Sequence, residues 1–427
     1  MRSLPGSDLL PAPLRGWALA AVGLLLAPLV FDSGLSVTLL SQMGIAIIAC
    51  LSYNILLGQG GMLSFGHAVY TGLGAYLAIH ALGAINRGAG WLPVSLLPLL
   101  GGLAGLLAAL VLGFLATRKS GTVFAMITLG LAELVGAVAL MAPSVFGGEA
   151  GVSANRVSGP AFAGIDFASD RQVYYLIAAY TLVCAAAMFA FTATPLGRML
   201  NAVRDNAQRA AFIGYDPQRV RHLAFIVSGF FAGVAGGLAA LLFEFVGPEA
   251  LGATRSGSYL LFTVLGGTTF FFGPVVGAVL MVLSQVLLSE LTRAWLLYLG
   301  LAFLFTVLLA PSGLVGVLVQ LHRILRGPWR HLVPVLPSLA LAGALAAPGA
   351  AALIEMLYHL QLRAALGPQL DFLGLRLDVH EPVHWMLAIA ACAAGLVQMH
   401  RLRPDLRGRW LAVAQALDDT GRAGGSR

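Results

Sequence analysis

Residues 36–83 read SVTLLSQMGIAIIACLSYNILLGQGGMLSFGHAVYTGLGAYLAIHALG. The stretch holds two apolar runs, at about 36–57 and 62–83, which a cluster of glycines separates. Each run has about the 20 residues that a helix needs to cross a bilayer. A strand of a membrane barrel would alternate apolar and polar residues over about ten positions, and neither run does so. The stretch therefore predicts two membrane-spanning helices.

Further apolar runs extend this pattern over the whole chain. They lie at about 17–31, 91–115, 122–142, 173–192, 223–245, 258–272, 274–291, 295–310, 332–357 and 383–399. Of the 427 residues, 59% are hydrophobic and 10% are charged, against about 25% charged residues in a soluble domain. We predict an all-α polytopic membrane protein with about ten core transmembrane helices and two C-terminal ones.

The basic residues orient these helices. With the N-terminus inside, 18 of the 25 basic residues fall in inside segments, six of them from Arg401 onward, and the outside connections hold most of the acids. Cytoplasmic loops of membrane proteins carry such an excess of Lys and Arg. The chain is therefore expected to have cytoplasmic N- and C-termini, and its net charge of +7 needs no nucleic acid partner.

No catalytic or metal site is predicted. The cysteines show no disulfide or metal-ligand spacing, at Cys50, Cys184 and Cys392. The letters HEPVH at 380–384 match a zinc-protease motif, which requires one continuous helix to carry both histidines. Pro382 disfavours a helical backbone conformation at the preceding residue, Glu381. We therefore expect the last span to begin at Pro382.

The chain also lacks a phosphate-binding loop. The nearest match runs from Gly113 to Lys119 and Ser120, with Arg118 where the second glycine belongs. We therefore expect the chain to bind no cofactor of its own.

Small residues recur every fourth position on three predicted spans. Such ridges allow helices to pack closely in lipid, where no hydrophobic force joins them. The ridges are Gly60, Ser64, Ala68 and Gly72; Gly101, Gly105, Ala109 and Gly113; and Gly229, Gly233 and Gly237. They predict a tightly packed bundle.

Two glycine clusters interrupt apolar runs in the two halves of the core, LLGQGGMLSFGH at 56–67 and VLGGTTFFFGP at 264–274. Paired interruptions of this kind point to a substrate site near the membrane midplane, although glycine clusters also form plain turns between spans. The polar residues beside them are the candidate substrate pathway: Asn54, Gln59, Ser64, His67 and Thr268, with Thr269 next to the last.

Glu133 is a lone acid inside the run at 122–142, where burying a charge is costly. It is either a further residue of the substrate pathway or a hydrogen-bonded contact between helices.

Two connections stand out. The inside segment at 194–222 is basic, with helical spacing through GRMLNAVRDNAQRAAFIG and a break at Asp216-Pro217. It predicts a helix on the cytoplasmic surface, or an Arg-rich loop that only fixes topology. The outside segment at 143–172 is rich in Gly and Ser and is either an ordered contact surface or a loose loop.

Five stretches together resemble the permease subunits of branched-chain amino acid ABC importers, in the LivM-like branch. They are YNILLGQGGMLSFGHAVYTGLGAYLA at 53–78, FAMITLGLAEL at 124–134, GRMLNAVRDNAQRAAFIGYDPQRVRHLAFIVSGFFAGVAGGL at 197–238, VLGGTTFFFGPVVGA at 264–278 and APSGLVG at 310–316. They occur in family order and cover about 40–316.

The resemblance implies a subunit of the bacterial inner membrane with several partners. These are a second homologous permease, two ATPase subunits that bind ATP and magnesium, a periplasmic substrate-binding protein and membrane lipid. It also implies a cytoplasmic coupling helix at 197–214, whose matching residues are Gly197, Arg198, Arg204, Asp205, Ala210 and Gly214. Arg204 and Asp205 would contact the ATPase groove. The acidic residue often found before the alanine pair is absent, because Gln208 and Arg209 precede Ala210.

The predicted segments are an N-terminal span at 1–35, a permease core at 36–318, a C-terminal extension with two spans at 319–400 and a basic tail at 401–427. The expected function is import of branched-chain or other apolar amino acids, driven by ATP hydrolysis on the partner subunits and not by an enzymatic activity of this chain. Import of urea or short amides, and transport driven by an ion gradient, are the alternatives.

Overall fold

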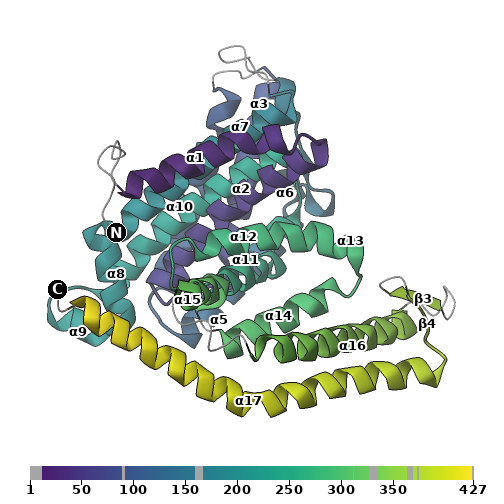
Figure 1. Cartoon of the computed structure of the whole chain (residues 1–427). Helices are drawn as coiled ribbons and strands as arrows, with labels where there is room; N and C mark the ends of the chain where they lie inside the picture. Colours follow the sequence, from purple (N-terminus) through teal and green to yellow (C-terminus); the bar gives the residue numbers. More distant parts are fainter. Residues whose placement is uncertain are drawn as a thin grey trace. The chain divides into compact units, whose positions relative to one another are not determined.

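The computed structural model describes residues 12–88, 92–158, 167–310, 312–326, 334–362, 369–372 and 375–425 (Figure 1). Residues 1–11 and 426–427 of the predicted terminal segments lie outside these ranges. The chain divides into two units, Met1–Leu288 with Ala302–Gly316, and Ser289–Leu301 with Val317–Arg427. The second unit thus contains the whole predicted C-terminal extension at 319–400 and the tail, together with residues 289–301 and 317–318 from before it.

The first unit is a bundle of helices with short turns between them. Its α-helices are α1 (Ala12–Val30), α2 (Gly34–Asn54), α3 (His67–Asn86), α4 (Leu97–Ala116), α5 (Thr122–Met141), α6 (Pro143–Phe146), α7 (Asp170–Ala193), α8 (Pro195–Asp205), α9 (Ala207–Phe212), α10 (Pro217–Phe243), α11 (Ala253–Gly266) and α12 (Gly273–Leu283). Two π-helices, η1 (Ile55–Gln59) and η6 (Ser284–Leu288), continue α2 and α12.

Among the described residues, nine helices are long and apolar enough to cross a membrane. A tenth span is present if the bent pair Trp295–Leu309 and Gly313–His322 counts as one. These spans, with almost no strand, confirm an all-α polytopic membrane protein. The run predicted at 258–272 corresponds to α11, which has only 14 residues. At 1.5 Å per residue this helix is about 21 Å long, shorter than the hydrocarbon core of about 30 Å.

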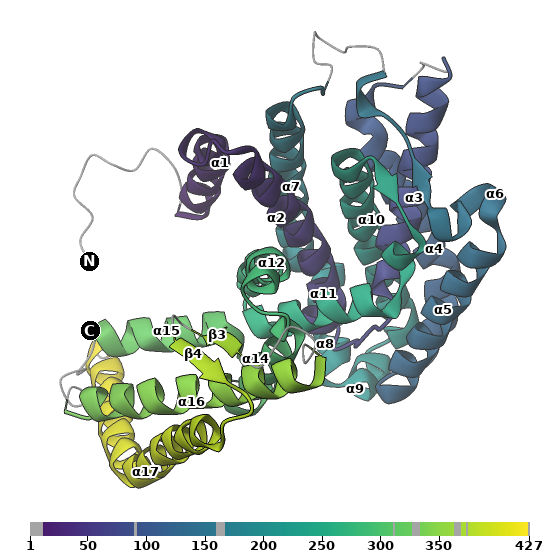
Figure 2. The ribbon, with the colours of Figure 1, turned by 90° about the vertical axis from the view of Figure 1, so that its right-hand side faces the viewer.

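The core of the first unit is the contact of α3, α4 and α10, which lie side by side in Figure 2. Gly74, Gly101 and Gly233 meet there, one from each helix. A Cβ on Gly101 would lie 2.6 Å from the carbonyl oxygen of Gly233, and a Cβ on Gly74 would lie 2.6 Å from its Cα. Only a residue without a side chain permits this approach, so the predicted ridges on α4 and α10 do pack against each other.

The first predicted ridge is not one helical face. Gly60 and Ser64 lie in the connection between η1 and α3, and only Ala68 and Gly72 are on α3. The regular spacing of small residues is therefore fortuitous across this connection, where the chain leaves the helix.

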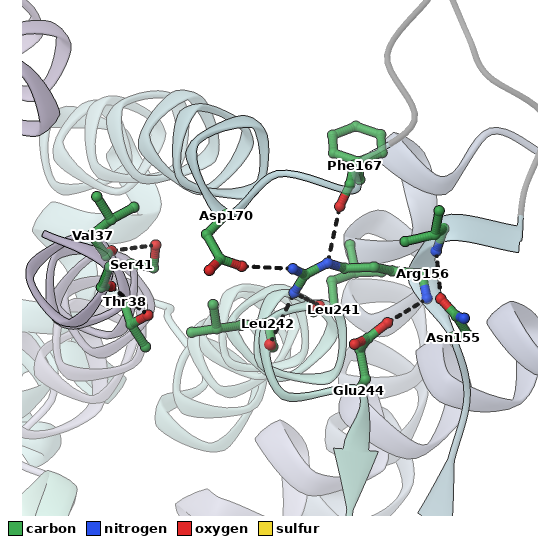
Figure 3. Close-up of polar contacts among 12 residues, drawn as sticks. Val37, Thr38, Ser41, Asn155, Arg156, Phe167, Asp170, Leu241, Leu242 and Glu244 are labelled. Carbon is green, nitrogen blue, oxygen red and sulfur yellow. Dashed lines mark hydrogen bonds and ion pairs between the residues drawn. The ribbon is translucent and has the colours of Figure 1, made fainter. Parts of the chain in front are cut away.

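The described parts of the outside segment at 143–172 are ordered (Figure 3). Strand β1 (Val152–Ser153) pairs with β2 (Phe245–Val246). Arg156 donates from Nη2 to Asp170 at 2.7 Å, from Nη1 to the carbonyl oxygen of Leu242 at 3.3 Å, and from Nε to that of Phe167 at 3.0 Å. Arg156 thereby joins the carbonyl end of α10 to the first turn of α7, where helix dipoles favour a cation and an anion respectively.

The second unit contains α13 (Ser289–Leu291), α15 (Gly313–Arg326) in part, α16 (Leu336–Leu362), strands β3 (Gln369–Phe372) and β4 (Leu375–Asp378), and α17 (Pro382–Gly425); α14 (Trp295–Leu309) begins in it. Helices α16 and α17 pack through glycines, because a Cβ on Gly349 would lie 2.6 Å from the amide nitrogen of Cys392. The prediction that Pro382 begins the last span is confirmed. His380 and Glu381 precede that helix, so the two histidines of HEPVH do not share a helical face.

Candidate functional site

The first glycine interruption connects two spans. The π-helix η1 carries α2 on to Gln59, after which Gly61 adopts φ +63° and the chain runs without helix to His67. Two interpretations of this cluster were open, a break near the midplane and a plain turn between spans. The structure fits the second, because the interruption lies between two candidate spans, Gly34–Gln59 and His67–Asn86.

The second interruption lies against the first. Helix α11 ends at Gly266, Gly267 takes φ +113°, which an L side chain rarely adopts, and α12 begins at Gly273. A Cβ on Gly58 would lie 2.7 Å from the carbonyl oxygen of Thr268. The two clusters, about 200 residues apart in the sequence, therefore meet in space.

A cavity of about 450 Å³ opens beside this meeting point. We call it the α8 cavity. It is lined by Gly58, Gln59, Asn201, Arg204, Thr268 and Thr269. Its walls are mostly polar and come from the end of α2, from the turn after α11 and from α8.

Helix α8 is hydrogen-bonded to the end of α2 at two points on the wall of this cavity. Arg204 donates from Nη1 to the carbonyl oxygen of Gly58 at 2.5 Å, and Asn201 donates from Nδ2 to Oε1 of Gln59 at 2.9 Å. The Nε of Arg204 also pairs with the Asp205 carboxylate at 3.0 Å. A guanidinium at the carbonyl end of a helix is favoured by the helix dipole. These two hydrogen bonds join α8 to η1, the continuation of α2.

The predicted coupling segment forms two helices, not one. Helix α8 ends at Asp205, and Asn206 then caps α9 by accepting a hydrogen bond from the amide of Arg209 at 2.9 Å. An Asn side chain that bonds its own backbone competes with helix continuation, and this explains a break that the helical spacing hides. The predicted break before Pro217 is present, with Asp216 as the N-cap of α10.

The six predicted coupling residues differ in exposure. Gly197 and Ala210 are buried. Arg198 and Asp205 are exposed, and Arg204 is 40% exposed. Gly214, with φ +93°, ends the segment.

A layer of buried polar groups joins the last turn of α2 to the start of α3 and to the connection before it. We call Ser52, Tyr53, Ser64 and His67 the polar layer. The Ser52 hydroxyl is 2.9 Å from Nε2 of His67, and Tyr53 donates to the carbonyl oxygen of Ser64 at 2.8 Å. Within the described chain, Nδ1 of His67 and Oδ1 of Asn54 are buried without a hydrogen-bond partner. Unpartnered buried polar atoms are costly and often mark functional positions.

Five of the six predicted pathway residues therefore lie together around the end of α2. Gln59 and Thr268 line the α8 cavity, Asn54 lies next to Gly58, and Ser64 and His67 belong to the polar layer. Glu133 lies apart from them, on an exposed face of α5.

Sequence reasoning missed two parts of the site. Asn201 was not singled out, although it lies three residues before Arg204 and so shares a face of α8 with it. The target of Arg204, a backbone carbonyl 146 residues earlier, leaves no mark in the sequence.

Comparison with known proteins gives one family. A family described as the branched-chain amino acid transport system permease component matches residues 35–312. The chain belongs to this family. The resemblance predicted over about 40–316 is thereby confirmed, and the protein is a multi-pass membrane permease.

Relatives of this permease family come from bacteria and an archaeon. The chain is 30% identical over 304 residues to the high-affinity branched-chain amino acid transport system permease protein LivM of Salmonella typhimurium, covering 66% of this chain and 70% of the relative. The Escherichia coli LivM is 29% identical over 295 residues, covering 64% and 68%. The probable LivH of Methanocaldococcus jannaschii is 28% identical over 271 residues, covering 60% and 83%. No solved structure gives a significant match.

Proposed function

We propose that this chain is the membrane-spanning permease subunit of an ATP-driven importer for branched-chain or other apolar amino acids. Family membership supports the class of protein. The observation that carries the mechanism is the pair of hydrogen bonds from Arg204 and Asn201 of α8 to Gly58 and Gln59 of η1, the continuation of α2. A surface helix fixed in this way to the wall of a polar cavity transmits an outside force to the pathway.

The force comes from partner ATPase subunits, which bind ATP and magnesium. The segment α8–α9 offers them an exposed apolar tip, since Phe212 is 89% and Ile213 is 66% exposed. Apolar side chains exposed in this way on a cytoplasmic segment mark a protein interface. Arg198 and Asp205 are exposed charged residues on the α8 part of the same segment. Arg204 acts on the inner side of α8, so docking and coupling use different residues of one helix.

A second, homologous permease subunit covers α5. Glu133 is near the middle of this 20-residue helix, on a face with the exposed side chains of Met126 and Leu134. A carboxylate facing lipid at this depth costs about 2.5–3.5 kcal/mol or more. Gly130 on the same face has open space where a Cβ would stand, so a partner helix can approach closely. This contact would remove Glu133 from lipid.

Reconstitution tests the proposed function. The complex of this chain with the second permease, two ATPases and the periplasmic binding protein, placed in proteoliposomes, should accumulate L-leucine only when ATP and magnesium are supplied. Uptake of leucine driven by a proton or sodium gradient without ATP would contradict the proposal. ATP-driven uptake of urea with no uptake of leucine would retain the importer and replace its substrate.

Cysteine labelling tests the orientation, with N- and C-termini in the cytoplasm of a bacterial cell. In a variant without Cys50, Cys184 and Cys392, a cysteine at Asp205, whose side chain is 68% exposed, should react in intact cells with a membrane-permeant maleimide and not with an impermeant one. A cysteine at exposed Ser169, before α7, is the control and should react with both. The opposite pattern would invert the topology and remove α8 from the ATPases.

A further inference from the structure

Three spans of the first unit converge at their inner ends, which the expected topology places at the cytoplasmic surface. These ends are the last turn of α4, the first turn of α5 and the first turns of α10. A Cβ on Gly113 of α4 would lie 2.6 Å from Cδ1 of Phe225 of α10, and the ring centroids of Phe225 and Phe124 of α5 are 6.0 Å apart. Phe225 thus packs against both neighbouring helices. Residues one turn earlier on this face of α10 therefore lie beside the turn at 117–121, which joins α4 to α5.

Positive charge gathers around this meeting point. Arg118 and Lys119 are exposed in the turn, and Arg221 is partly buried on the face of α10 that packs against α4 and α5. We call Arg118, Lys119 and Arg221 the basic patch. Within the part of the chain that the structure describes, none of the three forms an ion pair, and Asp216 at the start of α10 pairs instead with Nε of Arg219 at 3.3 Å. An arginine inside a membrane span is costly without a partner.

The first turn of α5 adds to the positive potential beside the basic patch. Gly121 precedes this 20-residue helix with φ +64° and provides no side-chain hydrogen bond to its first amides. The free amides and the helix dipole attract an anion. Guanidinium groups beside such amides suit the oxygens of a phosphate group in particular. The inner ends of these spans thus form an attractive position for a phosphate.

The neighbouring surface of α4 selects a lipid as the carrier of that phosphate. The guanidinium of Arg118 lies over the ring of Phe114, 4.7 Å from its centroid. Phe114 is exposed together with Leu107 and Leu110, on one face of a span that lipid chains cover in the membrane. A phospholipid contacts both the charges and this apolar face. A free phosphate ion or an acidic protein surface would contact the charges alone.

We propose that the basic patch binds the headgroup phosphate of an anionic phospholipid in the cytoplasmic leaflet. Arg118 and Arg221 are the ligands of the phosphate, Lys119 adds charge, and an acyl chain lies along Leu107, Leu110 and Phe114 of α4. The headgroup supplies the anion that Arg221 otherwise lacks, and it joins the inner ends of α4, α5 and α10. Basic pockets between helices on the cytoplasmic side are typical of such binding. This site does not depend on which solute the chain transports.

Lipid titration of the full chain in detergent micelles tests this binding, with native mass spectrometry and the melting temperature as readouts. The probes are dioleoyl phosphatidylglycerol, dioleoyl phosphatidylcholine, which has the same chains without net charge, and inorganic phosphate, which has charge without chains. Phosphatidylglycerol should bind and raise the melting temperature, and the other two should bind at least about tenfold more weakly. In R118Q/R221Q the affinity for phosphatidylglycerol should fall at least about tenfold, since two charged hydrogen bonds are lost, and R118K/R221K should retain part of it.

R87Q is the matched control, because Arg87 is an exposed arginine at the other end of α3 and its loss removes one positive charge away from the basic patch. R87Q should bind phosphatidylglycerol as the wild type does. An equal fall in R87Q, equal binding of phosphatidylcholine, or equal stabilisation by inorganic phosphate would overturn the proposal. So would unchanged affinity in a folded R118Q/R221Q. If that double variant does not fold, R118Q, which changes only an exposed side chain, should lower the affinity a few-fold, and an unchanged affinity there would also overturn it.

Discussion

Two sides of the first unit are built by different means. On one side α3, α4 and α10 meet through glycines with backbone against backbone, at Gly74, Gly101 and Gly233. On the other side α2 and α11 are interrupted, and a cavity and hydrogen bonds take the place of close packing. Backbone contacts leave no room for movement, whereas a few hydrogen bonds beside a polar cavity exchange readily with water. We therefore expect the first side to be a rigid scaffold and the second side to be the part that moves.

The largest expected effect comes from breaking the scaffold. In Gly105→Leu the new side chain meets the carbonyl oxygen of Gly229 and the Cα of Gly233. Because backbone cannot move aside as a side chain can, we expect a loss of at least about 3 kcal/mol of folding free energy, the upper end for overpacked cores. The variant should give no monodisperse peak in detergent by size-exclusion chromatography.

Gly23→Leu is the control for this substitution, because a Cβ on Gly23 of α1 meets nothing within 4 Å. It should be produced and behave as the wild type. A well-folded Gly105→Leu variant with normal uptake would show that this helix contact is not the rigid element.

A smaller effect is expected from cutting the link between α8 and α2. Arg204→Met keeps the aliphatic stem and removes the hydrogen bond to Gly58 and the ion pair with Asp205. A charged hydrogen bond contributes about 1.5–3 kcal/mol, so ATP-driven leucine uptake should fall about tenfold or more, while the complex assembles and hydrolyses ATP. Arg219→Met is the control, since the Arg219 side chain is 85% exposed on α10. Loss of ATP hydrolysis in step with uptake would make Arg204 a docking residue instead of a link.

The smallest effect concerns the border between the two sides. Ser52→Ala removes the hydroxyl that joins α2 to His67 at the start of α3. We expect a loss of about 1 kcal/mol in the free energy of unfolding and, if the polar layer closes the path next to the α8 cavity, a few-fold higher leak of leucine without ATP. Ser41→Ala is matched to it: Ser41 is also buried on α2, but its hydroxyl donates to the backbone of its own helix at Val37. Equal leak in both variants would mean that the layer does not close the path.

The scaffold was largely predictable from the sequence, because its determinants are local. Apolar runs predict spans, and glycines four residues apart on two such runs predict a close helix contact, as Gly101, Gly105, Gly229 and Gly233 make. Proline at the start of α10 and α17 predicts where those helices begin. Each of these patterns is read within one turn or one helix.

The moving side was only partly predictable, because its determinants are contacts between distant segments. The glycine clusters drew attention to Gln59 and Thr268, which line one cavity. The hydrogen bond from Arg204 to the carbonyl oxygen of Gly58 forms only when α2 and α8 assemble. Glu133 was noticed from its charge alone, and its role stays a prediction.

We expect the π-helical turn at the end of α2 to give the moving side a discrete step. Hydrogen bonds in a π-helix reach one residue further along the chain than those in an α-helix, so a return of η1 to α-helical geometry would shift its hydrogen bonds by one residue. Such a slip rotates the chain beyond it by about 100°, which would carry Gln59 out of the cavity wall and release Asn201. Transport by this chain would then switch between two conformations of η1, and would not depend on a gradual bending of long helices.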